Sequence, residues 1–91
     1  MSIKKYDALL EGLVINLEKK EILFNLDRLN NQFKLITALD KINKVFKEND
    51  IPEININELI RLSLGRENQY EYFLSLIKLK FENLGFKLEI K

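Results

Sequence analysis

Residues 69–84 read QYEYFLSLIKLKFENL, and this stretch places apolar side chains on two sides of one predicted helix. At about 100° per residue, one face gathers the apolar side chains Tyr70, Phe73, Leu74, Ile77, Phe81 and Leu84. Tyr72, Leu76 and Leu79 fall on nearly the opposite side. A helix that is apolar on two sides is either central in its own bundle or shared with a partner.

The tail that follows, GFKLEIK over residues 85–91, alternates apolar and charged side chains. We expect Gly85 to end the helix, because glycine readily adopts the left-handed conformation of a helix C-terminus. The alternation after it predicts a half-buried strand. A single strand needs a mate, and the sequence offers two: residues 53–57, or the same strand of another copy of the chain.

Two helical patterns precede this region. Apolar residues recur at helical spacing over residues 3–17 and predict a first amphipathic helix, and a second stripe steps by three or four over residues 22–46. One helix over residues 18–48 would be about 46 Å long, whereas a domain of this size has a radius of gyration of about 12 Å. Two alternatives follow: the helix breaks or bends at Asn30-Asn31, or it lies against something beyond its own domain.

The stretch DIPEININELI, residues 50–60, contains the only proline of the chain. We interpret its first half as a connector, because proline ends the preceding helix and turns the chain. A short strand through Ile54 and Ile56, which alternate with polar residues, is the alternative. A short helix over residues 56–64 is then predicted, stopped by Gly65.

Three polar residues stand three positions before a glutamate, the spacing of a capping box at a helix start; they are Asp50, Asn55 and Asn68. Together these patterns predict a single domain over residues 1–91 with a mostly α-helical fold. We expect a small bundle of four to five helices in which the second is long or bent, and which a short C-terminal strand could complete.

The composition argues against several classes of function. Histidine and cysteine are absent, which removes the commonest general base, the commonest metal ligand and every thiolate site. The glycines are isolated, so no phosphate-binding loop is present, and Ser63 and Ser75 have no histidine to activate them. We therefore expect no enzyme, no metal and no cofactor. The chain shows neither a signal-peptide pattern nor a membrane-length apolar run, so we expect a cytoplasmic protein.

Lysines gather on the predicted second helix, at Lys34, Lys41, Lys44 and Lys47. The first three share an arc of about 80°, which is consistent with a strip that contacts phosphates. The alternative is the solvated back of an amphipathic helix. The net charge of only +1, the absence of arginine from the strip and the presence of Glu48 in the same arc favour this alternative.

These observations lead to one expectation of function and one alternative. We expect a small protein that acts by protein–protein binding, as an adaptor, an inhibitor or an assembly factor, and that forms a homodimer. The candidate partner or dimer interface is Tyr72, Leu76 and Leu79, because interfaces bury aromatic and aliphatic side chains. The alternative is a small dimeric DNA-binding regulator that uses the lysine strip.

Overall fold

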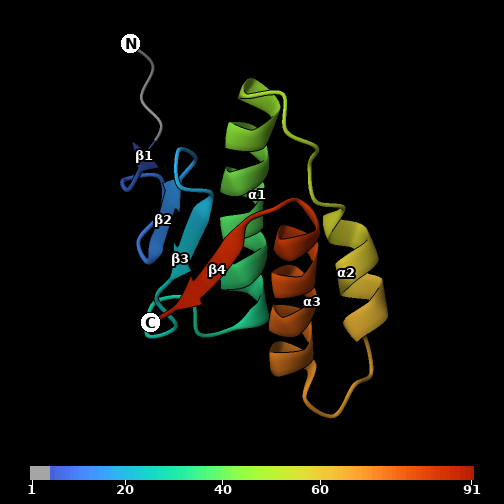
Figure 1. Ribbon diagram of the computed structural model, residues 1–91. Coiled ribbons are helices and arrows are strands. Elements are labelled where there is room, and N and C mark those ends of the chain that lie inside the picture. Colours follow the sequence, from blue (N-terminus) through green and yellow to red (C-terminus); the bar gives the residue numbers. More distant parts are fainter. Residues whose placement is uncertain (1–4) are drawn as a thin grey trace.

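The computed structural model describes residues 5–91 as three α-helices and a four-stranded mixed sheet (Figure 1). The elements in chain order are β1 (Lys5–Tyr6), β2 (Leu13–Asn16), β3 (Glu21–Phe24), α1 (Gln32–Glu48), α2 (Ile56–Ser63), α3 (Gln69–Asn83) and β4 (Lys87–Ile90). The fold is therefore α+β, and the prediction of a mostly α-helical bundle of four to five helices is wrong.

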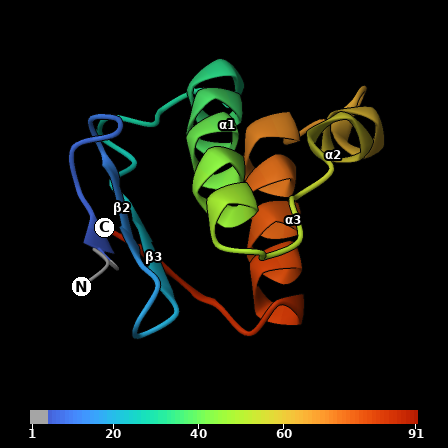
Figure 2. The ribbon, with the colours of Figure 1, turned by 90° about the horizontal axis from the view of Figure 1, so that it is seen from above.

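The sheet has the strand order β1-β2-β3-β4. The first three strands pair antiparallel, whereas β4 pairs parallel with β3. Parallel neighbours need a long crossover, and here all three helices lie in the chain between them. Figure 2 shows the helices on one face of the sheet, so the described part of the molecule has two layers.

The prediction of a first helix over residues 3–17 is wrong, because the described part of this region holds the strands β1 and β2 and the turn between them; Ile3 and Lys4 lie outside the described residues. Leu13 and Ile15 are buried while the residue after each is half-buried, which is the period of a strand with one face on the core. The apolar residues of the longer stretch 3–17 also fit helical spacing, so the sequence favoured a helix over this shorter alternation. Gly12 precedes β2 with a φ of +93°, a value that no right-handed helix contains.

The apolar stripe 22–46 belongs to two elements, β3 and α1, and not to one long helix. β3 buries Ile22 and Phe24 on the face toward the helices. α1 begins after Asn31, whose side chain accepts a hydrogen bond from the backbone N–H of Lys34 at 2.9 Å. A helix boundary does lie at Asn31, but a strand and not a helix precedes it. Both alternatives for a helix over residues 18–48, bent or broken at Asn30-Asn31 or unbroken, are therefore wrong.

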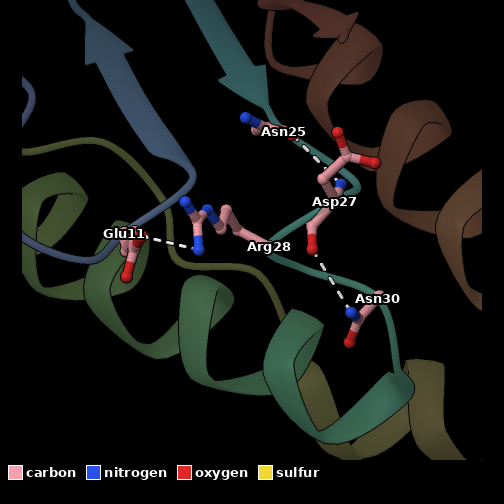
Figure 3. A network of polar contacts seen from close by, with 5 residues as sticks. All are labelled: Glu11, Asn25, Asp27, Arg28 and Asn30. Atoms are coloured by element: carbon pink, nitrogen blue, oxygen red, sulfur yellow. Dashed lines mark hydrogen bonds and ion pairs between the residues drawn. The ribbon is translucent and has the colours of Figure 1, made fainter.

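Polar side chains shape the turn between β3 and α1 (Figure 3). Asn25 Oδ1 accepts a hydrogen bond from the backbone N–H of Asp27 at 3.0 Å, and Asn30 Nδ2 donates to the Asp27 carbonyl at 3.2 Å. Arg28 forms an ion pair with Glu11 at 3.0 Å, which links the turn to the loop before β2. Both charged side chains are more than half exposed, so this pair adds little stability.

The connector interpretation is confirmed, because residues 51–55 form neither helix nor strand. Asn43 of α1 holds this segment by pairing with the backbone of Ile54 in both directions. Asn43 Nδ2 donates to the Ile54 carbonyl at 2.9 Å, and Asn43 Oδ1 accepts from the Ile54 N–H at 2.7 Å. The side chain of Ile54 is buried, so the connector is anchored to the core as well.

Of the three residues at which the sequence suggested a capping box, only Asn55 caps a helix through its side chain. Asn55 begins α2, and its side chain accepts from the Glu58 N–H at 3.1 Å. Asn68 precedes α3 but makes no side-chain capping hydrogen bond. Asp50 has a φ of +58° and begins no helix.

The end of α3 and the tail strand follow the sequence predictions. Gly85 has a φ of +84°, and the N–H of Phe86 donates to the Phe81 carbonyl at 2.8 Å, as in a Schellman cap. β4 then pairs with β3 over Glu21–Phe24. The alternative mate, residues 53–57, is therefore wrong for this strand.

The core between the sheet and the helices contains a cluster of phenylalanine rings. Phe81 of α3 meets Phe24 of β3 and Phe46 of α1 edge-on, with centroid distances of 6.3 Å in each case. Phe86, at the entry to β4, lies 5.1 Å from Phe46. The cluster joins the early strand β3 to the last part of the chain, so the core closes only when these distant segments meet.

Candidate interaction surfaces

α3 is central among the helices, which is one of the two alternatives that its sequence left open. Its inner face is fully buried, at Phe73, Ile77 and Phe81. α2 packs along another side of α3 (Figure 2). Of the predicted interface residues, Leu76 is half-buried against the core and Leu79 remains 51% exposed. Tyr72 is half-buried as well. The predicted interface residues are thus partly covered within the chain and partly open to solvent.

An ion pair joins α2 to α3, because the Glu58 carboxylate lies 2.9 Å from Lys80 Nζ. Leu62 follows Glu58 by four residues, and Leu76 precedes Lys80 by four. The two helices run side by side in opposite directions (Figure 1), so both leucines lie one helical turn further along the same seam. Leu62 is 43% exposed and extends the apolar surface onto α2.

We call the four residues Leu62, Tyr72, Leu76 and Leu79 the α2–α3 patch. Sequence reasoning found the three residues on α3 and missed Leu62. The signal that was available is its position on the α2 wheel, away from the buried Leu59 and Ser63. Which helix α2 packs against is a tertiary fact, so the wheel alone could not join Leu62 to the other three.

The ion pair at the edge of the patch also affects titration. The hydrogen bond and the positive charge of Lys80 lower the pKa of the Glu58 carboxyl. A carboxyl whose pKa is lowered by folding stabilises the fold above its ordinary pKa, and this contribution is lost as the pH falls through the folded value. The Glu58 side chain is about a third exposed, so salt partly screens the effect.

Arg66 holds Tyr72 at one end of the patch. The guanidinium carbon lies 4.3 Å from the centroid of the tyrosine ring, and Arg66 Nη2 donates to the tyrosine hydroxyl at 3.3 Å. Leu64, in the same loop between α2 and α3, is 63% exposed. Aromatic and arginine side chains beside exposed leucines match the composition that protein interfaces favour.

Ser63, which the sequence offered as a hydroxyl without a base, has a structural role. It is buried, and its hydroxyl donates to the Ile60 carbonyl at 3.0 Å and accepts from Gln32 Nε2 at 3.1 Å. Gln69 donates to Gln32 in turn. This cluster ties together the start of α1, the end of α2 and the start of α3.

A groove of about 560 Å³ lies between α1 and the segment that enters α2. Its apolar residues are Ile36, Ile54, Ile56 and Ile60, and its carboxylates are Asp40 and Glu53. Two of its polar side chains are already engaged, because Asn43 holds the connector and Asn55 caps α2. No group of three or more potential metal ligands occurs in residues 5–91.

The four lysines of the proposed phosphate strip all lie on α1. Lys34, Lys44 and Lys47 are exposed, and Lys41 is half-buried. Asp40 and Glu48 are exposed on the same helix, and they interrupt the positive charge. The strip therefore has the geometry expected of the solvated side of an amphipathic helix.

Comparison with known proteins adds no relative. No family model, no curated protein and no solved structure matches this chain. Among the helices that the structure describes, none combines the length and the apolar character needed to cross a membrane. The surfaces of the molecule are therefore the basis for a functional proposal.

Proposed function

We propose that this protein acts by binding another protein, without catalysis, and that the α2–α3 patch is the docking surface. The observation that supports the proposal is that Leu62 on α2 and Leu79 on α3 are both about half exposed, on two helices that the Glu58–Lys80 ion pair joins. The patch spans two helices from separate parts of the chain. This makes it a surface of the fold and not the apolar remainder of one helix.

The chemistry of the patch suggests what it would bind. Fully burying a leucine that is now half exposed favours association by about 1 kcal/mol. The rim offers charges of both signs, from the Glu58–Lys80 pair and from Arg66. An apolar patch with a mixed polar rim suits an amphipathic helix of a partner, laid across the patch with its apolar side inward.

The proposal is tested with Leu79→Glu, which places a charge at the most exposed position of the patch. Phe33→Glu is the matched control, because Phe33 is also an exposed apolar residue, at 76%, but lies at the start of α1. Both variants should fold, as judged by circular dichroism. Tagged wild type and tagged Phe33→Glu should then retain the same protein from extracts of the native host, and Leu79→Glu should lose it.

Two outcomes count against this function. Retention of the same protein by the wild type and by Leu79→Glu would show that the α2–α3 patch is not the docking surface. Retention of nucleic acid by the wild type, lost when Lys41 and Lys44 are changed to glutamine, would favour the DNA-binding alternative instead.

A further inference from the structure

The last strand of the sheet has an open edge. Within residues 5–91, β4 stands at the end of the strand order, next to β3 alone. The Lys87 N–H donates to the Lys20 carbonyl at 2.9 Å, and the Lys91 N–H donates to the Phe24 carbonyl at 2.8 Å. Since backbone groups alternate along a strand, Lys87, Glu89 and Lys91 direct theirs toward β3, and Leu88 and Ile90 direct theirs away from it.

An edge of this kind is a template for another strand, because its N–H and C=O groups lack partners in the sheet. Ile90 is also 47% exposed, although its position in the register places it on the same face as the buried Leu88. The edge therefore combines unpaired backbone groups with an apolar side chain that the fold leaves partly uncovered.

We propose that a second copy of the chain occupies this edge. The two β4 strands pair antiparallel about a two-fold axis at Leu88, so that the two sheets join into one. In this register the Leu88 N–H of each copy donates to the Leu88 carbonyl of the other, and the Ile90 N–H donates to the Phe86 carbonyl of the other. The Phe86 N–H takes no part, because it already donates to Phe81.

Charge complementarity selects this register. Centring on Leu88 places Lys87 of each copy directly opposite Glu89 of the other copy, which gives two such pairs. Glu21 is the neighbour of Lys87 within the same sheet, so the lysine would lie between two glutamates in an alternating row. Centring on Glu89 instead would place Glu89 opposite Glu89 and Lys87 opposite Lys91, and like charges directly opposite are destabilising.

The same charges favour the Leu88-centred register of the two β4 strands over the others. Lys87 and Glu89 have side chains that are 74% and 44% exposed, and within one copy they form only a loose pair at 3.5 Å. They are therefore free to face a second copy. Charged side chains on an edge strand oppose unspecific pairing. Of the registers centred on Leu88, Glu89 and Ile90, only the first gives both Lys87 and Glu89 a partner of opposite charge, because centring on Ile90 pairs Glu89 with Lys91 and leaves Lys87 without one.

This dimer differs from one made through the α3 side chains. The tail strand has its mate in β3, the stripe 22–46 is not one long helix, and α2 covers part of α3. The features that suggested a dimer through Tyr72, Leu76 and Leu79 are thus met within one chain. The outer edge of β4, in contrast, has no partner strand within the described residues. A dimer through β4 leaves the α2–α3 patch free for another partner.

The first test uses charge reversal. Lys87→Glu and Glu89→Lys each turn both cross-copy pairs into like-charge pairs, and each variant alone should dimerise at least about tenfold more weakly than the wild type. Mixed in equal amounts, the two variants should form a heterodimer with opposite charges at both positions. Sedimentation velocity measures the strength of dimerisation for the wild type, for each variant alone and for the mixture.

A wild type that stays monomeric at high micromolar concentration would overturn the proposal. So would variants that dimerise as tightly alone as the wild type does. Leu79→Glu should leave the dimer intact, so the result separates this inference from the proposed function: loss of the dimer in that variant would place the interface at the α2–α3 patch and overturn pairing through β4.

The second test determines the register of the two β4 strands. The chain has no cysteine, so any disulfide must form between the introduced residues. Opposed residues of a non-hydrogen-bonded antiparallel pair lie about 4.5 Å apart between Cα atoms, a separation that a disulfide can span. Lys87→Cys and Glu89→Cys should therefore form a disulfide with each other under mild oxidation when mixed. Efficient linkage of Glu89→Cys to itself would show the Glu89-centred register and contradict the one proposed.

Discussion

Gly12 is a residue at which one methyl group would disturb the fold. Its φ is +93°, and a Cβ there would lie 2.7 Å from the Cβ of Arg28 and 3.3 Å from the Asn25 carbonyl oxygen. We expect Gly12→Ala to lower the free energy of unfolding by about 2–4 kcal/mol, because backbone strain and a steric clash add. Urea unfolding followed by circular dichroism measures the loss.

The control for this change is Gly85→Ala. Gly85 has a similar φ of +84°, but nothing lies within 4 Å of a Cβ built there. Its loss should be about 1 kcal/mol, the cost of the backbone conformation alone. Equal losses at the two glycines would mean that the contact with Arg28 does not constrain Gly12.

Asn43 is a second residue on which the fold depends. Its amide satisfies both the N–H and the carbonyl of Ile54, and the side chain of Ile54 is only 6% exposed. Asn43→Ala should lower the free energy of unfolding by about 2–3 kcal/mol, because it leaves two partly buried backbone groups without partners. Asn57→Ala, at an exposed asparagine nearby, should change it by less than about 0.5 kcal/mol. A small effect of Asn43→Ala in urea unfolding would show that water replaces the amide.

At the scale of the element, the structure distinguishes two asparagines that look alike in sequence. Asn31 caps α1 through its side chain, whereas Asn68 precedes α3 without such a hydrogen bond. We expect Asn31→Ala to lower the free energy of unfolding by about 1 kcal/mol and Asn68→Ala to have a clearly smaller effect. Thermal unfolding of both variants checks this, and equal losses would contradict the difference in capping.

At the scale of the whole molecule, the distribution of charge predicts weak binding to nucleic acid. The net charge is +1, and acidic residues interrupt the lysines of α1. The protein should therefore pass through a heparin or DNA column without retention at low salt. Retention that falls steeply between about 50 and 200 mM salt would indicate several phosphate contacts and would support the DNA-binding alternative.

The parts of the fold that the sequence predicted are those that depend on near neighbours along the chain. The start of α2 at Asn55 and the end of α3 at Gly85 each involve hydrogen bonds between residues at most five positions apart. Capping and helix termination are local in this sense. For that reason these helix boundaries could be predicted from the sequence without knowing which elements pack against the helices.

The fold class, in contrast, was decided by tertiary pairing. Residues 13–16 fit both a helical stripe and a strand, and the pairing of β2 with β3 and the burial of Leu13 and Ile15 settle them as strand. β3 needs β4, some sixty residues later, to complete its other side. Such long-range contacts leave no local mark in the sequence, so a helix was predicted where a sheet forms.

The same division holds for the surfaces. The sequence by itself determined that α3 is apolar on two sides and that its tail alternates as a strand. Only the tertiary structure decided that α2 covers part of α3 and brings Leu62 to the patch, and that β3 takes one edge of β4 and leaves the other open. The reason is physical: a side chain's periodicity fixes which way it points, but what it meets there depends on segments far away in the chain.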